Sequence, residues 1–262
     1  MGRPGGKIRH PKSEEVMELV GHLRQKYQDP RGTIRHRETN VFSGPAHFQP
    51  NMPSEPILGL VNTWMFQDAL DVDTTNVWNE TNSGAGTSLT VQDERAGFAK
   101  VTNGAGNDNY YFYESKFELG LLLANKGLWF RSHFQIGDAD EADMFIGLCA
   151  QLASGNLFDN RVDSIGFFME DGSAQIKIEA SKDGAATQTN TGIGITDGAE
   201  VTVGIRAVGT TSIEFLVNEG AAGVIRTNLP DDTELSFSFG VRNGQASANT
   251  MSIGRTALVQ DE

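Results

Sequence analysis

Apolar and polar side chains alternate with a period of two along much of the chain after residue 60. The pattern is clearest in Ile176–Ala180, Val201–Ala207 and Leu235–Phe239. Such alternation indicates β-strands that bury one face. Turn-forming dipeptides separate several of these segments, because Gly, Asn and Asp tolerate positive φ. They are Asp171-Gly172, Asp183-Gly184, Asp197-Gly198 and Asn243-Gly244.

Fourteen segments have this strand character. They are Trp64–Phe66, Ser88–Val91, Phe98–Val101, Tyr110–Tyr113, Leu128–Ile136, Met144–Ala150, Ile165–Met169, Ala174–Ala180, Thr187–Thr191, Val201–Val208, Ser212–Val217, Gly223–Arg226, Leu235–Val241 and Met251–Val259. No long helical period lies between them, which argues against alternating βα units. Fourteen strands are more than one open twisted sheet usually holds. We therefore predict an all-β fold, a two-sheet antiparallel jelly-roll sandwich over residues 60–262.

The first part of the chain has the opposite charge from the rest. Residues 1–40 hold nine Lys/Arg and five Asp/Glu, whereas the remainder holds 12 basic and 29 acidic residues. A basic N-terminal arm (residues 1–59) therefore precedes an acidic body, and we expect the arm to contact a partner that the body does not contact. The acidic body argues against nucleic acid as its partner.

One short α-helix is predicted within the otherwise extended arm, at about residues 13–28. Ser13 is a plausible N-cap, and Asp29-Pro30 ends the helical pattern. The apolar side chains form one stripe: Val16, Leu19, Val20, Leu23 and Tyr27. An isolated helix of this length is marginal, so the stripe needs a surface, either on the body of the same chain or on another subunit.

The basic residues of the arm complete the predicted partner-binding set. They are Arg3, Lys7, Arg9, Arg31, Arg35 and Arg37. Nucleic acid is an unlikely ligand, because acidic residues are interleaved and no DNA- or RNA-binding motif is present. Four of the five histidines also lie in the arm, but their spacing is not that of metal ligands, so we expect no metal site there.

Cysteine content and hydropathy indicate the cellular environment in which the chain folds. Cys149 is the only cysteine and lies in an apolar run, so we expect a buried, unreactive thiol and assembly in a cytoplasm. The longest apolar candidate, Leu119–Ala124, is too short to cross a membrane. The N-terminus has no apolar segment of a secretory signal.

Catalytic patterns are weak. Some sandwich-shaped glycoside hydrolases place carboxylates at alternate positions of one strand, but no strand here carries Glu-x-Asp-x-Glu. The nearest acidic group is Asp138, Asp140, Glu141 and Asp143, which we interpret as a solvated turn, with a cation site through oxygen ligands as the alternative. We therefore expect no catalytic site and no cofactor, and predict that the protein is not an enzyme.

Aromatic residues leave a second possibility open. Trp64, Trp78, Trp129 and the run Tyr110–Tyr113 are expected mainly in the core, because each buries a large area. Part of the tyrosine run must face outward by alternation, so a sugar-stacking platform remains an alternative.

The order of several strands and turns is similar to a known family. The relevant stretches are Leu128–Ile136, Asp143–Leu148, Asp163–Phe168, Lys182–Gly184, Ile213–Gly220, Asn228–Asp231 and Ser252–Arg255. They resemble the central part of concanavalin A-like (laminin-G-like) jelly rolls. In particular, they resemble structural proteins of tailed-bacteriophage virions that decorate and stabilise the capsid.

This resemblance implies a non-enzymatic virion protein on the capsid surface, assembled in the host cytoplasm. Its arm would bind the major capsid protein and neighbouring copies of itself. The alternative is a carbohydrate-binding, lectin-like module on a phage fibre or another host-facing surface.

Overall fold

The computed structural model describes residues 61–66, 76–92, 98–152 and 155–261. The predicted arm, with its helix at residues 13–28, lies outside this part of the chain. The described residues contain strands and turns but no α-helix, which confirms the all-β prediction. They also contain no long apolar helix of the kind that spans a membrane.

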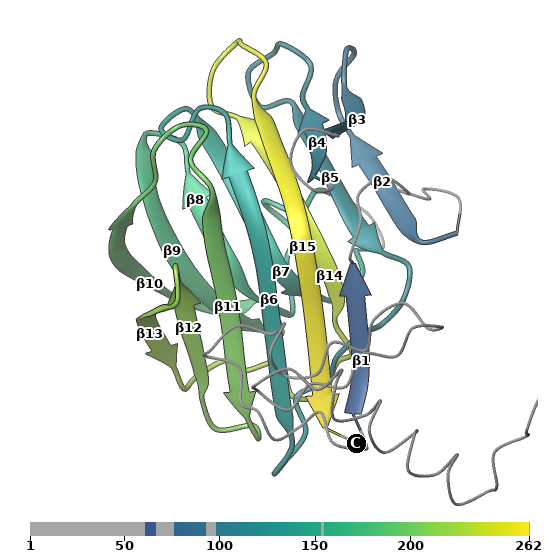
Figure 1. Ribbon diagram of the computed structural model, residues 1–262, viewed down its shortest axis with the longest axis vertical. Coiled ribbons are helices and arrows are strands. Elements are labelled where there is room, and N and C mark those ends of the chain that lie inside the picture. The colour runs from purple at the N-terminus through teal and green to yellow at the C-terminus, as the bar shows by residue number, and fades with distance from the viewer. Residues whose placement is uncertain (1–60, 67–75, 93–97, 153–154, 262) are drawn as a thin grey trace, which may run out of the picture. The chain divides into compact units, whose positions relative to one another are not determined.

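Fifteen strands form two antiparallel sheets that pack face to face (Figure 1). The seven-stranded sheet has the order β10-β9-β8-β7-β14-β5-β2. Its strands are β2 (Trp78–Asn82), β5 (Tyr110–Ser115), β7 (Ala142–Cys149), β8 (Ser164–Glu170), β9 (Ser173–Lys182), β10 (Ala185–Gly194) and β14 (Ser236–Asn243). Successive strands along the chain often belong to different sheets, as in a jelly roll.

The eight-stranded sheet has the order β13-β12-β11-β6-β15-β4-β3, and β1 pairs with β15 beside β4. Its strands are β1 (Val61–Phe66), β3 (Ser88–Gln92), β4 (Phe98–Thr102), β6 (Gly127–Ile136), β11 (Val201–Val208), β12 (Ile213–Val217), β13 (Gly220–Ile225) and β15 (Thr250–Asp261). On the same edge, β15 thus pairs first with β4 and then with β1.

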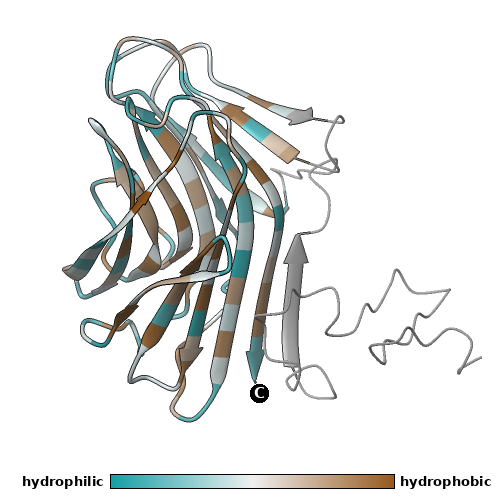
Figure 2. Ribbon diagram, turned by 60° about the vertical axis from the view of Figure 1, so that its left-hand side comes forward, coloured by the Kyte–Doolittle hydropathy of each residue, from teal (hydrophilic) through white to brown (hydrophobic). Residues whose placement is uncertain are grey.

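The core forms where the inner faces of the two sheets meet. Hydrophobic and hydrophilic bands alternate along many strands in Figure 2, as period-two burial requires. An aromatic group fills one part of this interior, where Trp78 packs edge-on against Phe237 and Phe239 at ring-centroid distances of 5.7 Å. Trp78, Tyr111 and Tyr113 are buried in the core, as predicted. Trp129 is buried too, but alternation places it on the outer face of β6, outside the core cluster; the side chain of Trp64 is not among those described.

The seven-stranded sheet also buries much of its outer face. Phe112 of β5, Phe145 and Cys149 of β7, and Phe168 of β8 form a second apolar cluster there, with Leu157 from the connection between β7 and β8. We call residues 155–162 of that connection the cover segment. Residues on both faces of β7 and β8 are therefore apolar, and the outer face is covered by the chain itself.

Each of the fourteen predicted strand segments overlaps an observed strand, with four of them running one residue too far, and one strand was missed. β2 has the sequence Trp-Asn-Glu-Thr-Asn, which is polar apart from Trp78, because it is an edge strand with mostly exposed residues. Two of the four turn dipeptides join hairpins; Asp183 and Gly184, with φ of 52° and 77°, connect β9 and β10. Asp197-Gly198 lies in the connection between the sheets that joins β10 to β11, whereas Asn243 ends β14 and Gly244 begins the connection to β15.

Two glycines of the seven-stranded sheet are expected to respond differently to a methyl group. A Cβ on Gly147 of β7 would lie 2.3 Å from the Ile165 carbonyl oxygen and 2.5 Å from Gly166 Cα. Gly147→Ala should therefore force the backbones of β7 and β8 apart and lower the free energy of unfolding by about 1–3 kcal/mol. Gly194→Ala in β10 is the matched control, because its nearest contact would be at 4.0 Å. Urea denaturation of both variants tests this, and equal stabilities would contradict it.

Candidate functional site

One accessible part of the outer face of the seven-stranded sheet lies where β5, β14 and β7 align. Tyr110 of β5 stands opposite Arg242 of β14, and Arg242 stands opposite Asp143 of β7. Alternation places these three side chains on the same face as Phe112 and Phe145. Unlike those two phenylalanines, Tyr110 and Arg242 are only partly buried.

The cover segment adds Phe158 and Asp159 to this row. The Arg242 guanidinium lies 5.3 Å from the centroid of the Phe158 ring. Arg242 Nε donates to Asp143 Oδ2 at 2.5 Å, and Nη1 donates to both carboxylate oxygens of Asp159 at 2.8 and 2.9 Å. We call Tyr110, Phe158 and Arg242 the aromatic–arginine patch; both rings are partly exposed.

Local hydrogen bonds shape the cover segment at the patch. Asn156 Oδ1 accepts the backbone N–H groups of Phe158 and Asp159, each at 2.9 Å, and Asn156 Nδ2 donates to Asp159 Oδ2 at 2.8 Å. An asparagine that caps the backbone in this way favours a tight turn. Asn156 and then Arg242 lower the pKa of Asp159, so that this carboxylate is ionised at neutral pH. The patch therefore combines ring faces with fixed charged groups.

Two buried glutamates lie in one row of the same face. Glu114 of β5 and Glu179 of β9 are 3% and 2% exposed. Burial raises the pKa of Glu114 to about 7, although the Leu152 N–H donates to it at 3.3 Å. Burial also acts to raise the pKa of Glu179, but hydrogen bonds from Arg161, Gln188 and Ser164 outweigh it and lower that pKa.

The two glutamates do not form an acid–base pair with each other. Strands β14, β7 and β8 lie between β5 and β9. Four strand spacings of about 4.8 Å separate their backbones by roughly 19 Å. Glycosidases that use two carboxylates need them about 5–9.5 Å apart. Glu179 is further held on its own side of the sheet by Ser164 and Gln188.

Glu114 is expected to make stability depend on pH. Its pKa is 4.5 in the unfolded chain and about 7 in the folded protein, so the folded state binds the proton more tightly. Stability is then highest below about pH 4.5 and decreases through pH 7, by about 3 kcal/mol from this group. Glu114→Gln should remove that part of the decrease, whereas Glu170→Gln at an exposed site should not. Urea denaturation of the three proteins between pH 5 and 8 measures the effect; parallel profiles would refute it.

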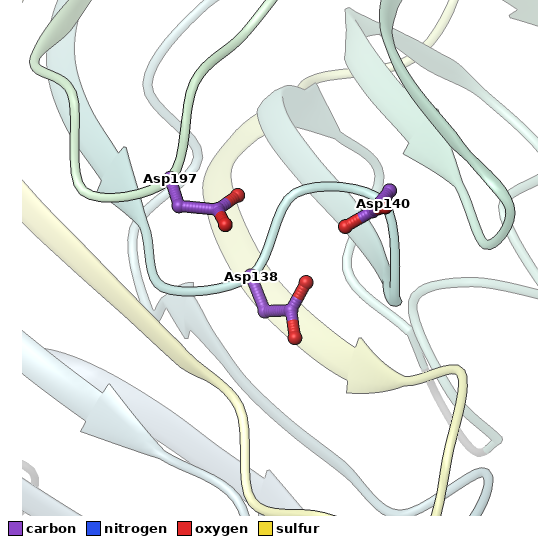
Figure 3. A group of neighbouring side chains, drawn as sticks. All are labelled: Asp138, Asp140 and Asp197. Carbon is purple, nitrogen blue, oxygen red and sulfur yellow. The ribbon is translucent and has the colours of Figure 1, made fainter.

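A separate acidic group lies in the loops that join the sheets. Asp138 and Asp140 follow β6, and Asp197 precedes β11; their carboxylates converge in Figure 3, with ligand oxygens within 4.8 Å of one another. Burial and then neighbouring carboxylates raise the pKa of Asp138. Three carboxylates in this arrangement could hold a hard cation such as Ca²⁺.

This group differs from the one considered in the sequence. Asp138 and Asp140 come together as that interpretation required, but their third member is Asp197, more than fifty residues away. Asp143 instead pairs with Arg242 on the sheet. Ala139 N–H donates to Asp197 Oδ1 at 2.8 Å, which ties the two loops together.

The other predicted site residues are placed as follows. Cys149 is buried, and burial raises the pKa of its thiol, as expected for an unreactive cysteine. The eleven predicted partner-binding residues of the arm all lie outside the described residues. They are Arg3, Lys7, Arg9, Val16, Leu19, Val20, Leu23, Tyr27, Arg31, Arg35 and Arg37.

Sequence reasoning missed Phe158, Arg242, Arg161, Glu114 and Glu179. Of the tyrosine run, it did expect one part to face outward, and Tyr110 does so. Glu114 and Glu179 end or interrupt apolar strand sequences, which is a weak signal for buried carboxylates. The carboxylates that pair with Arg161 and Arg242 lie 18 and 83–99 residues away, so no local pattern shows these ion pairs.

Comparisons with known proteins establish the fold. No protein-family model and no curated protein matches the chain. A protein of unknown function from Shewanella oneidensis MR-1 aligns with a TM-score of 0.55 and 11% identity, covering 99% of this chain and 97% of that one. The endo-1,3-beta-glucanase from Streptomyces sioyaensis gives a TM-score of 0.55 and 12% identity over 82% and 99%. Peanut lectin gives 0.50 and 11% over 77% and 98%.

These similarities confirm the concanavalin A-like jelly roll and correct one expectation. The prediction that the protein is not an enzyme is contradicted, because the structures that share its fold include glucanases and a lyase. The comparisons also give no support for a role in a phage capsid.

Proposed function

We propose that this protein binds a glycan at the aromatic–arginine patch on the outer face of its seven-stranded sheet. The observation that carries the proposal is the arrangement of Tyr110 and Phe158 beside Arg242, with Asp143 and Asp159 held at its edge. Next to the patch, the cover segment closes the face with Leu157 over the phenylalanine cluster. At the patch, ring surfaces and charged groups together meet solvent.

The chemistry of the patch suits a sugar. The C–H faces of a pyranose pack against aromatic rings, and its hydroxyls donate to carboxylates and accept from a guanidinium. Both aspartates are already oriented by Arg242, so little side-chain freedom is lost when a ligand binds. Similarity to a lectin and to glucanases supports a glycan as the ligand class.

Charge favours a neutral glycan over an anionic one. Asp143 and Asp159 outnumber the single Arg242 that pairs with them, and the Asp171 N–H already donates to Asp143. The chain as a whole has a formal net charge of −13. A uronate or sialylated ligand would meet like charge at the patch, whereas hydroxyls would find acceptors.

Affinity electrophoresis tests the proposal with laminarin as the neutral polysaccharide and alginate as the anionic one. Laminarin should retard the full chain more than alginate does. Tyr110→Ala and Phe158→Ala should each weaken retardation about tenfold, since a stacked ring contributes on the order of 1 kcal/mol or more. Phe117→Ala is the matched control, because Phe117 is 50% exposed outside the patch.

An assay for new reducing ends in the same mixtures separates binding from cleavage. Retardation with no new ends supports recognition, and new ends lost in the patch variants would assign hydrolysis to this face. The proposal is refuted if laminarin does not retard the chain. It is also refuted if Phe117→Ala weakens retardation as much as Tyr110→Ala and Phe158→Ala do.

We also propose, as a second function, attachment through the arm, to a phage capsid or to another acidic protein surface. The charge contrast between residues 1–40 and the body supports it. A chain lacking residues 1–40 should keep its folded sandwich and fail to join the particle or partner that the full chain joins. Cosedimentation with particles measures this, and unchanged cosedimentation of the truncated chain would exclude the arm as the attachment element.

A further inference from the structure

Arg161, at the end of the cover segment, makes an ion pair beneath the surface of the outer face. Its Nε and Nη2 donate to the two carboxylate oxygens of Glu179 at 3.0 and 3.3 Å. Ser164 Oγ and Gln188 Nε2 complete the coordination of that carboxylate at 2.8 and 2.7 Å. The side chains of Arg161 and Glu179 are 10% and 3% exposed, so water screens this pair far less than a surface pair.

The third nitrogen of the same guanidinium holds the backbone of the cover segment. Nη1 donates to the carbonyl oxygens of Leu157 and Phe158 at 2.6 and 3.3 Å. The guanidinium also lies 4.6 Å from the centroid of the Phe145 ring on β7. One side chain thus links the backbone beside Phe158 both to β9 and to the sheet below it.

We infer that Arg161 is the positioning residue of the glycan site: it sets the place of Phe158 and Asp159 relative to Tyr110 and Arg242. This inference rests on the proposed function. The patch needs residues from two sources, the rigid strands β5, β14 and β7 and the cover segment. Arg242 reaches the segment only through Asp159 and the Phe158 ring, whereas Arg161 fixes its main chain.

The role requires arginine rather than any cation. A guanidinium presents its donors in a planar fork, which allows a two-point contact with Glu179 while Nη1 turns to the two carbonyls. A lysine ammonium at this position could pair with Glu179, but as a single point charge it could not also span to both carbonyl oxygens. Arg161→Lys should therefore still neutralise the buried Glu179 carboxylate but no longer hold the backbone of the cover segment.

Two variants separate positioning from folding. Arg161→Lys retains a cation beside Glu179, and the double variant Arg161→Met with Glu179→Gln removes both charges without leaving one unpaired. Lys182→Met is the control, since Lys182 pairs with Asp231 and Asp232 at the surface away from the patch. Each full-length protein is examined by thermal unfolding, by hydrogen exchange of residues 155–160 and by retardation in laminarin gels.

Both Arg161 variants should unfold cooperatively, with exchange in residues 155–160 faster by about tenfold or more and exchange in β6 and β15 unchanged. Their retardation by laminarin should fall by about tenfold, as in Phe158→Ala, because the ring is no longer held at the patch. Full retardation of either variant, or unchanged exchange in the segment, would overturn the inference. If the unmodified chain is not retarded, the proposed function fails instead, and the exchange data alone then decide whether Arg161 holds the segment.

Discussion

The structure depends on burying both faces of one sheet. Strands β7 and β8 pack their inner side chains against the eight-stranded sheet and their outer ones against the cover segment. An apolar outer face cannot be left in water, so the connection between β7 and β8 must return across it. That return carries Phe158, Asp159 and Arg161 to the sheet, and hence the proposed site exists because the hydrophobic surface needs a cover.

Two buried carboxylates on this face show how location decides charge. Glu179 has three hydrogen-bond donors around it, including an arginine, and stays ionised despite burial. Glu114 accepts the Leu152 N–H at its carboxylate, but burial raises its pKa to about 7 and favours the neutral form below that pH. The same residue type thus acts as an anchor at one end of a row of the sheet and as a titratable group at the other.

Most of the fold could be predicted from the sequence, because burial on one face of a strand leaves a local period of two. The missed strand, β2, carries four polar residues at an edge and so lacks that signal. The dipeptide Asn243-Gly244 predicted a tight turn, but Asn243 is 1% exposed and bonds to the carbonyl oxygens of Gly104 and Gly106. Its role is to join loops rather than to reverse the chain.

The site was much less predictable than the fold. Tyr110 could be expected to face outward from alternation alone, but its neighbours Arg242 and Phe158 reach it through pairing of β5 with β14 and through the path of the cover segment. These relations join residues far apart along the chain. They depend on which strands pair, and the sequence of one strand does not indicate which strand it pairs with.

The pairing of β15 with β6 bears on how the chain folds. Residues 251–260 lie beside residues 128–136, so this central ladder closes a loop of more than a hundred residues. Closing that loop costs chain entropy before the hydrogen bonds and packing of the ladder can stabilise it, and this makes folding slow. The hairpins of β8, β9 and β10 have no such delay and are expected to form early. Until β15 pairs with it, β6 has one open edge, and its unpaired backbone groups favour aggregation of the incompletely folded chain.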